Sequence, residues 1–309
     1  MNWTSVKLQI VELLDQHKRI TSVAEQLELK QPTVTFHMKS LEKELGVQLF
    51  YSSSGKVHLT EAGQALRHYA SKINSLALEA ERIVKEFNAW GSGKLKIGAS
   101  FVPGTYLLPS ILSAFSKQHP NISLSLTIRP SPVIQSMLLG HELDIGLVSA
   151  EPFQWTSLIG ETLCEDELVL FFSPHHGLSR KETVYPDHIG EVPFILHGQE
   201  SSTRSMTLKW AKSLGLTLTP VMEMDSLEAI KQAVMAGNCV SFISRSAIAA
   251  ELERGELVCR EIPQNPFKRY IYFAYNEDRV RSALFNSFFE FLRDSLRQQG
   301  MIYKNDIPC

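Results

Sequence analysis

Residues 31–42 read QPTVTFHMKSLE, and this stretch decides the fold of the first part of the chain. Pro32 has a fixed φ and no N–H, so it suits the first turn of a helix, where an amide donor would have no partner within the helix. The apolar side chains that follow have the spacing of one buried helical stripe: Val34, Met38, Leu41 and Leu45. We therefore predict a helix that begins here and has a short polar outer face.

A second short helix is predicted just upstream. Thr21 and Ser22 can cap it, and Ser22 with Glu25 fits the S/T-x-x-E capping box. Residues 28–31 join the two helices into a helix-turn-helix, whose second helix has the size of a DNA major groove.

Two strands and one more helix complete this unit. Residues 47–51 and 56–59 each read as a short strand, and residues 52–55 form the turn between them. Residues 3–14 are amphipathic and are predicted to pack beneath the two reading helices. The unit is then a winged helix-turn-helix.

The segment resembles the amino-terminal domain of the LysR-type transcriptional regulators. The matching residues stand in the order and at the spacing of that family: Ala24, Leu27, Gln31, Pro32, Val34, Thr35, Leu41, Glu42, Leu45, Gly46, Leu49, Phe50, Leu59, Thr60, Ala62 and Gly63. The resemblance extends over essentially the whole chain in length and order of elements, and it implies double-stranded operator DNA as a partner. The outer face of the second helix and its surroundings supply the residues expected to contact DNA: Thr21, Gln31, Pro32, Thr33, Thr35, Phe36, His37, Lys39, Ser40 and Lys56.

The chain departs from the family pattern in two places. Tyr51 and Ser52 stand where the family usually has an arginine after its Leu-Phe pair, so an expected phosphate clamp is missing. Phe36 and His37 stand where a basic residue or glutamine is common. The base-reading face is therefore unusual.

Charge gives no separate sign of a nucleic-acid partner. The whole chain of 309 residues carries a formal net charge of −2, and residues 1–63 hold seven basic and seven acidic side chains. Since DNA affinity depends largely on phosphate neutralisation, a neutral reading head should bind weakly alone and rely on several heads acting together. The start lacks a signal-peptide pattern, and no stretch approaches the roughly 20 apolar residues of a membrane span, so we expect a cytoplasmic protein with no membrane partner.

A long helix is predicted to follow the winged unit. Thr60 can cap it, and apolar residues recur at heptad spacing over residues 61–88. One interpretation packs this stripe on the core of its own domain. The preferred one makes residues 61–90 a dimerising linker helix with a glycine-rich hinge at residues 90–93, and a dimer or tetramer follows.

Residues 91–309 alternate strands and helices in two α/β lobes. They resemble the effector-binding domain of the LysR family, itself similar to periplasmic solute-binding proteins. Lobe I is assigned to about residues 94–165 with 268–300 and lobe II to about 166–267, with residues 167–173 as a crossing strand. The predicted fold class is therefore α+β and multidomain: a winged helix-turn-helix over residues 1–60, a linker helix, and a two-lobed effector domain.

Ligands of such sheets lie outside the carboxyl ends of the strands, near helix N-termini. The loops at those ends hold hydroxyls and N–H groups that suit a small carboxylate or inorganic anion, and Phe101 and Phe242 are expected to form an apolar wall. The alternatives are that each hydroxyl only caps its helix, that Arg204 pairs with Glu200, and that His197 is structural rather than a pH sensor. The expected effector-binding residues are Ser100, Phe101, Thr105, Ser131, Ser149, His197, Ser201, Ser202, Thr203 and Arg204.

Enzymatic chemistry has little support in the sequence. Nucleophile-elbow, P-loop, zinc-protease and dinucleotide motifs are missing, and neither Asp144 nor Glu223 has a partner acid or base set by spacing. We expect no catalytic residues, no metal and no cofactor. Four cysteines are widely separated, so inert thiols are preferred over a redox sensor: Cys164, Cys239, Cys259 and Cys309.

The sequence thus predicts a homo-oligomeric regulator that binds operator DNA and a small effector, with RNA polymerase as a further candidate partner. One alternative is a metabolite-sensing binding protein whose helix-turn-helix contacts proteins rather than DNA. Another is an enzyme built on the α/β lobes.

Overall fold

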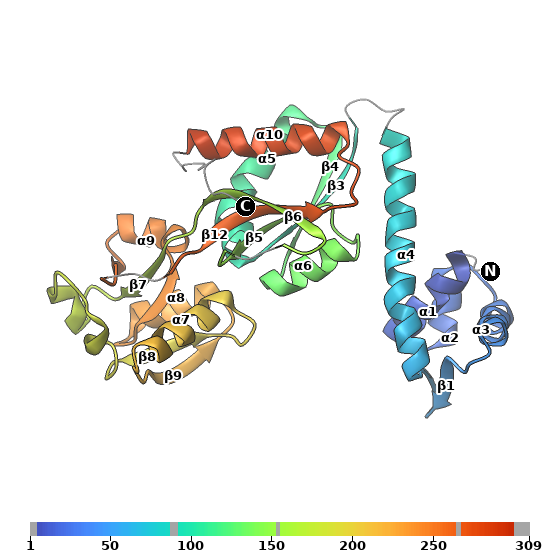
Figure 1. The fold of residues 1–309 in the computed structure, drawn as a ribbon, viewed down its shortest axis with the longest axis horizontal. Helices are drawn as coiled ribbons and strands as arrows, with labels where there is room; N and C mark the ends of the chain where they lie inside the picture. Colours follow the sequence, from blue (N-terminus) through green and yellow to red (C-terminus); the bar gives the residue numbers. More distant parts are fainter. Residues whose placement is uncertain (1–4, 87–91, 153–154, 264–266, 300–309) are drawn as a thin grey trace. The chain divides into compact units, whose positions relative to one another are not determined.

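A computed structural model describes residues 5–86, 92–152, 155–263 and 267–299 (Figure 1). The chain divides into two compact units, one over residues 1–88 with 140–142 and the other over residues 89–139 with 143–309. Each unit has its own hydrophobic core. No helix among the described residues is long and apolar enough to cross a membrane.

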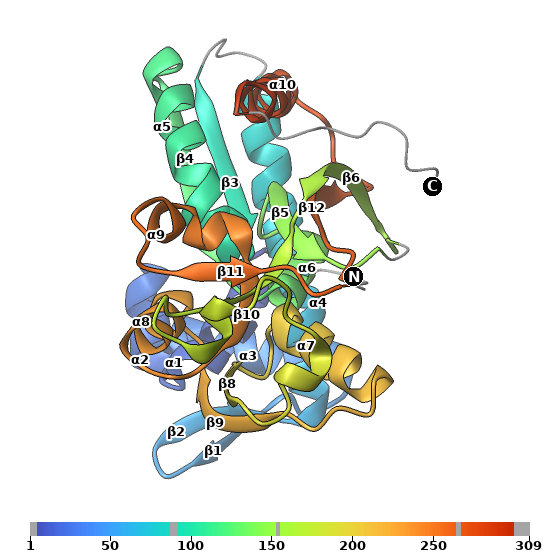
Figure 2. The same cartoon turned by 90° about the vertical axis from the view of Figure 1, so that its left-hand side faces the viewer.

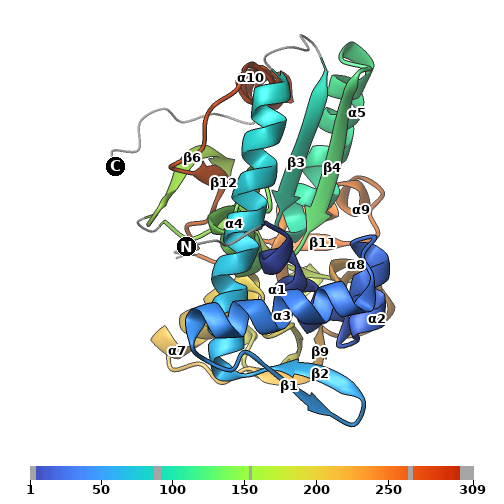
Figure 3. The same ribbon diagram turned by 90° about the vertical axis from the view of Figure 1, so that its right-hand side faces the viewer.

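The first unit begins with a winged helix-turn-helix around one small core (Figure 3). The predicted helix at Pro32 is present, and its buried stripe includes Val34, Met38 and Leu41. The wing is an antiparallel hairpin that pairs Tyr51 with His58. The elements are α1 (Ser5–His17), α2 (Ile20–Gln26), α3 (Gln31–Leu45), β1 (Phe50–Ser53) and β2 (Lys56–Leu59).

The predicted capping box at the start of α2 is wrong. The N-cap is Arg19, whose extended backbone supplies the carbonyl that accepts from Val23 N–H, and no side chain caps the helix. Lys18 adopts a left-handed φ of 55° directly after α1. Because the chain turns at Lys18, the helix begins one residue before Thr21, and both Thr21 and Ser22 lie inside its first turn.

Two further predictions for this unit need correction. Leu45 is the last residue of α3, and its side chain is exposed rather than part of the buried stripe, since the left-handed Gly46 ends the helix there. The first wing strand begins at Phe50 and not at residue 47. The Glu42 carboxylate accepts hydrogen bonds from the backbone N–H groups of Leu49 and Phe50, which ties this segment to α3 before the hairpin begins.

Helix α4 (Glu61–Glu86) follows, and Thr60 caps it as predicted by accepting from Gly63 N–H at 3.1 Å. Its first turns contribute Leu66 and Ala70 to the winged-domain core. Three apolar side chains of the predicted heptad stripe, Tyr69, Ile73 and Leu76, are exposed instead. Phe87, Asn88 and the first half of the predicted hinge lie outside the described residues.

A five-stranded sheet forms lobe I of the second unit. The first three strands in chain order are parallel, as predicted, and the two others are antiparallel to their neighbours. Figure 2 shows two of the parallel strands, at residues 93–99 and 122–128, with the helix at residues 108–118 alongside. The strand order is β4 (Ile122–Ile128), β3 (Gly93–Ala99), β5 (Ile145–Ala150), β12 (Tyr270–Asn276) and β6 (Leu158–Glu165).

Helices cover both faces of this sheet. On one face, α5 (Leu108–Gln118) and α10 (Ala283–Gln298) lie side by side (Figure 1). They pack through the rings of Phe115 and Phe288, whose centroids lie 5.2 Å apart. On the other face lies α6 (Ser131–Leu139). A single π-helical turn, η1 (Pro103–Leu107), leads into α5. Because β3, β4 and β5 are parallel, their carboxyl ends lie at the same edge of the sheet.

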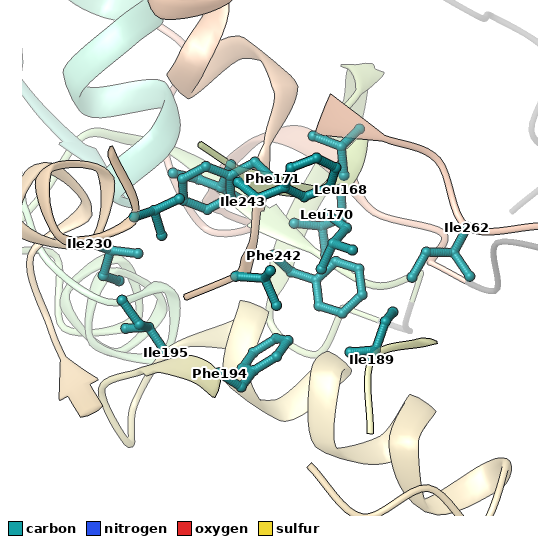
Figure 4. Close-up of a cluster of buried hydrophobic side chains, with 14 of the residues drawn as sticks. Leu168, Leu170, Phe171, Ile189, Phe194, Ile195, Ile230, Phe242, Ile243 and Ile262 are labelled. Carbon is teal, nitrogen blue, oxygen red and sulfur yellow. The ribbon is translucent and has the colours of Figure 1, made fainter. Parts of the chain in front are cut away.

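Lobe II holds two smaller sheets around an aromatic core (Figure 4). One is the parallel pair β8 (Pro193–His197) and β9 (Thr219–Met224), and the other has the order β10 (Ser241–Ser244), β7 (Leu168–Phe172) and β11 (Val258–Arg260). An isolated bridge between Phe194 and Val240 links the sheets. The helices are α7 (Ser202–Ser213), α8 (Leu227–Ala236) and α9 (Ala249–Glu253), with short 3-10 turns at η2 (Gly177–Arg180), η3 (Pro186–His188) and η4 (Arg245–Ile248).

The prediction that residues 167–173 form a crossing strand is wrong. These residues form β7, which is the central strand of a lobe II sheet and pairs with β10 and β11, so it lies within lobe II and does not run between the lobes. The crossings lie instead at Asp166 and at Arg269, where Asp166 N–H donates to the Arg269 carbonyl at 2.9 Å. The last strand and helix return to lobe I as predicted, whereas β6 and β11 have no counterpart in the sequence prediction.

Candidate ligand cleft and nucleic-acid interface

A cleft of about 740 Å³ lies between the two lobes, at the strand ends where ligands of such sheets are expected. Its walls come from the ends of β3, β4 and β5 in lobe I and from the loop after β8 and the start of α7 in lobe II. Eight of the ten expected effector-binding residues line it: Ser100, Phe101, Ser131, Ser149, His197, Ser201, Ser202 and Thr203.

The lobe I wall is a network of three serines from three strand ends. Ser149 N–H donates to Ser100 Oγ at 2.9 Å, and Ser131 Oγ donates to the Ser149 carbonyl at 3.0 Å. The main chain of Ser149 is thus held on both sides, while its own Oγ is buried with no partner. Because an unsatisfied buried hydroxyl is costly, this atom is a candidate ligand contact.

The lobe II wall is the N-terminus of α7. Ser201 is the N-cap, but its side chain makes no cap hydrogen bond, so the simple capping role does not apply to this hydroxyl. The backbone N–H groups of the first turn, at Ser202 and Thr203, have no partners inside the helix. Together with the helix dipole they favour an anion at this point.

Arg269 also lines the cleft, and the sequence analysis missed it. Its side chain is 1% exposed, and Nε lies 2.9 Å from Asp166 Oδ2. Nη1 donates to Thr203 Oγ1 at 2.8 Å, and Nη2 is buried with no partner. The sequence offered only its position directly before a largely buried strand, which indicates a partner inside the fold but does not identify that partner.

His197 is structural in character and does not titrate near neutral pH. Burial lowers its pKa to about 4, and the nearby charge of Arg269 acts in the same direction, while a hydrogen bond to the Phe242 carbonyl opposes them. Its Nε2 lies 2.7 Å from that carbonyl. The neutral ring therefore donates from Nε2.

Three expected site residues lie elsewhere. Thr105 is exposed on η1 and is not part of the cleft lining, since that turn carries its side chain away from the strand ends. Arg204 is not part of the cleft lining; it pairs with Glu223 at 2.6 Å rather than with Glu200, and Nη1 donates to the His197 carbonyl. Phe242 is no wall of the cleft, because β10 buries it in the lobe II core (Figure 4).

The two carboxylates that the sequence analysis considered have partners inside the fold. Asp144 pairs with Arg279 at 2.9 Å and Glu223 with Arg204, so both carboxylates have structural partners. No group of three or more potential metal ligands was found in the described part of the chain. Burial raises the pKa of the Cys164 thiol to about 12, which keeps it in the unreactive protonated form.

In the winged domain, the outer face of α3 forms a continuous surface. Gln31, Pro32, Thr35, Phe36 and Lys39 line one shallow depression, and Thr21 lines the adjoining one. Phe36 is 67% exposed in the centre of this surface. An exposed aromatic ring on a reading helix can contact thymine methyl groups, and Lys39 can neutralise a phosphate.

Four expected DNA contacts remain, and only one of them, Lys56, is exposed. Thr33 is half-buried on α3, and Lys56 is exposed on the wing. Ser40 faces α1 instead, because its hydroxyl accepts from Lys7 and donates to Glu44. His37 is half-buried, and its Nδ1 is buried without a partner.

The wing differs from the expected phosphate clamp in a specific way. Tyr51, which stands where the family usually has arginine, stacks on His58 across the hairpin with ring centroids 5.4 Å apart. This pair stiffens the wing but adds no fixed positive charge.

Two protein-family models match most of the chain. The model of the LysR substrate binding domain matches residues 91–297, and that of the bacterial regulatory helix-turn-helix protein, lysR family, matches residues 6–64. This chain belongs to the LysR family. The predicted family and fold class are thereby confirmed, and the protein is a LysR-type transcriptional regulator.

Individual relatives of this LysR-type regulator include a "Probable RuBisCO transcriptional regulator" of Trichormus variabilis. It is 31% identical over 291 residues, which cover 93% of this chain and 86% of the relative. The CcmR regulatory domain of Synechocystis PCC6803 in complex with 2-PG is 25% identical with a TM-score of 0.61, covering 69% of this chain and 98% of that one. Full-length CbnR complexed with its target DNA shares the fold at 20% identity and a TM-score of 0.68, covering 95% and 100%.

Proposed function

We propose that this LysR-type regulator binds operator DNA through α3 and the wing, dimerises through α4, and adjusts transcription in response to a small anion bound between the lobes. In this proposal residues 1–60 read DNA, residues 61–90 link the subunits, and residues 91–309 sense the effector. The small anion is a carboxylate or an inorganic anion.

One observation carries the effector half of this proposal. The cleft contains a buried guanidinium nitrogen of Arg269 and a buried hydroxyl of Ser149, and neither has a partner within the protein. Buried donors of this kind are rarely left unsatisfied, and an anionic ligand would satisfy both. The related CcmR domain with 2-PG in its structure supports a small-molecule effector for this chain as well.

The exposed stripe on α4 supports dimerisation. Tyr69, Ile73 and Leu76 are exposed at heptad spacing on a 26-residue helix, and a second copy of the same helix would bury them. Pairing two reading heads also compensates for their neutral charge, because two weak DNA contacts on one operator act together. CbnR, which shares this fold, has been found in complex with its target DNA, and this supports DNA as a partner.

The proposed mechanism is a shift between two lobe arrangements. Because both lobes contribute to the cleft, a ligand that contacts both favours one degree of closure over another. Altered closure would change the spacing between the two reading heads on DNA. The size of the response equals the difference in ligand affinity between the two arrangements.

The test is a selection of genomic DNA fragments by the full-length protein, with and without 2-PG and a panel of small carboxylates. Because relatives are RuBisCO regulators, the promoter of that operon is included where the host has one. We expect enrichment of a site with two related half-sites, and we expect Thr35→Glu to abolish it. Enrichment that survives Thr35→Glu would show that α3 does not read DNA and would favour a protein-contact role for the helix-turn-helix.

A further inference from the structure

We infer that Phe36 reads a thymine of the operator through its 5-methyl group, so that the protein distinguishes DNA sites that differ by one methyl group in the major groove. The inference rests on the proposed function and deepens it, because it assigns the chemical feature that the centre of the reading face recognises. The base 5-methylcytosine carries the same group and should be accepted at the same position.

Phe36 is the most exposed large apolar side chain among the described residues, at 67%. It lies in the N-terminal half of α3, the part of a reading helix that contacts base edges. Its neighbours Val34 and Met38 are buried in the domain core, so the ring faces away from that core. A phenyl ring in water is unfavourable, and an apolar group that covers the ring would remove this cost.

The surface beside the ring has a shallow depression with apolar and polar members. It is lined by Ile20, Gln31, Pro32, Thr35, Phe36 and Lys39. The ring of Phe36 also meets that of His37 edge-on, with centroids 5.8 Å apart and 64° between the ring planes. A group of the size of a methyl can therefore enter the depression and contact the ring.

Several polar groups of this face are committed within the protein. Thr35 Oγ1 donates to the Gln31 carbonyl at 3.1 Å, and Ser40 Oγ donates to Glu44 at the same distance. A hydroxyl has one hydrogen, so neither side chain has a donor left for a base. Nδ1 of His37 is buried and cannot reach a base edge. Apolar contact is therefore the main means of recognition at the centre of this face.

Thymine matches this surface because it presents an apolar group, the C5-methyl, in the major groove. Contact with the ring would remove both the methyl group and the phenyl surface from water. Lys39 lines the same depression, so the expected occupant combines an apolar group with negative charge. Operator DNA has both, whereas a second copy of this chain would have to bury the lysine against an apolar surface.

The test uses the full-length protein and the operator that the genomic selection yields. Each thymine of one half-site is replaced in turn by uracil, which pairs as thymine does and lacks only the methyl group, and affinity is measured by fluorescence anisotropy. We expect one position at which uracil weakens binding about fourfold, which corresponds to about 0.8 kcal/mol for burial of one methyl-sized group. Substitution in both half-sites should weaken binding about sixteenfold, since separated positions are roughly additive.

A second pair of operators restores the methyl group on a different base. At the position that uracil identifies, a cytosine–guanine pair is compared with a 5-methylcytosine–guanine pair. These two operators have the same hydrogen-bonding groups and differ only in the methyl. We expect the methylated operator to bind about fourfold more tightly.

Two variants connect the methyl effect to the ring. Phe36→Ala and Phe36→Gln change an exposed side chain, so both should remain folded, and each should bind its thymine and uracil operators equally. The comparison is made within each variant, so that a general loss of DNA affinity cancels. Leu45→Ala is the control, since it removes another exposed apolar side chain of α3 that lies outside the depression. It should keep the full uracil penalty.

The inference is overturned if uracil is tolerated at every thymine of the half-site, or if Phe36→Ala keeps the wild-type penalty. An enriched operator without any uracil penalty would leave DNA binding intact and refute only the role of Phe36. If the selection enriches no operator, the proposed function fails and the inference fails with it. A lower mass of Phe36→Ala in analytical ultracentrifugation, with unchanged DNA affinity, would assign the ring to a contact between copies and overturn the inference.

Discussion

The buried pair between Asp166 and Arg269 makes a quantitative prediction about the lobe crossings. Both side chains are 1% exposed, and the guanidinium Nε lies 2.9 Å from the carboxylate. Removing one partner leaves an uncompensated buried charge, which costs about 3–5 kcal/mol. For a domain of this size each kcal/mol lowers Tm by roughly 2–4 °C, so Asp166→Ala or Arg269→Met alone should lower Tm by roughly 6–20 °C.

The assay is differential scanning calorimetry of the full-length protein, run as a double-mutant cycle. Because Asp166→Ala with Arg269→Met removes both charges, the double variant should be far more stable than the sum of the two single effects. Glu256→Ala is the control, since it breaks an exposed pair with Arg254 that should contribute about 0–1 kcal/mol. Single effects as small as the control, or additivity within about 0.5 kcal/mol, would refute the coupling of the two crossings.

The remaining predictions concern other parts of the chain. Leu76→Asp places a charge in the exposed stripe of α4 and should shift the dimer towards monomer in analytical ultracentrifugation, whereas an unchanged mass would exclude this stripe as the interface. Thr60→Ala removes the N-cap of α4 and should destabilise the winged domain by about 1 kcal/mol, measured by urea unfolding followed by circular dichroism; no change would mean that the cap hydrogen bond is not stabilising. Lys39→Ala should weaken binding to all DNA sequences and reduce the slope of log K against log salt by about 1, whereas an unchanged slope would show that Lys39 contacts no phosphate. Folded His197 takes up a proton only near pH 4, whereas the unfolded residue does so near its ordinary pKa of 6.5. Unfolding therefore takes up a proton between these values, so stability should fall as the pH drops through this window, and His197→Asn should flatten that part of the pH profile of Tm.

The sequence predicted the elements whose signals are local. Pro32 marked the start of α3, Thr60 the start of α4, and the alternation of strands and helices the parallel half of lobe I. In each case the deciding interaction lies within a few residues or follows a simple period. The capping box at Ser22 was wrong for a related reason, since the left-handed turn at Lys18 places the N-cap at Arg19, three residues earlier.

The candidate site was only partly predictable, because its central contacts are long-range. The serines at 100, 131 and 149 could be placed at strand ends from sequence alone. Arg269 could not, because its partners Asp166 and Thr203 are distant in sequence and meet it only when the chain crosses between the lobes twice. Phe242 was misplaced because an apolar strand end looks the same whether it faces a cleft or a core.

We propose that a small anion in the cleft changes how the protein contacts its operator DNA. The most direct measurement is DNase I footprinting of the full-length regulator on its selected operator, with and without a carboxylate that raises the Tm of the wild type but not of Ser149→Ala. We expect this carboxylate to change the extent or spacing of the protected region for the wild type only. A footprint that is identical with and without the bound carboxylate would contradict it.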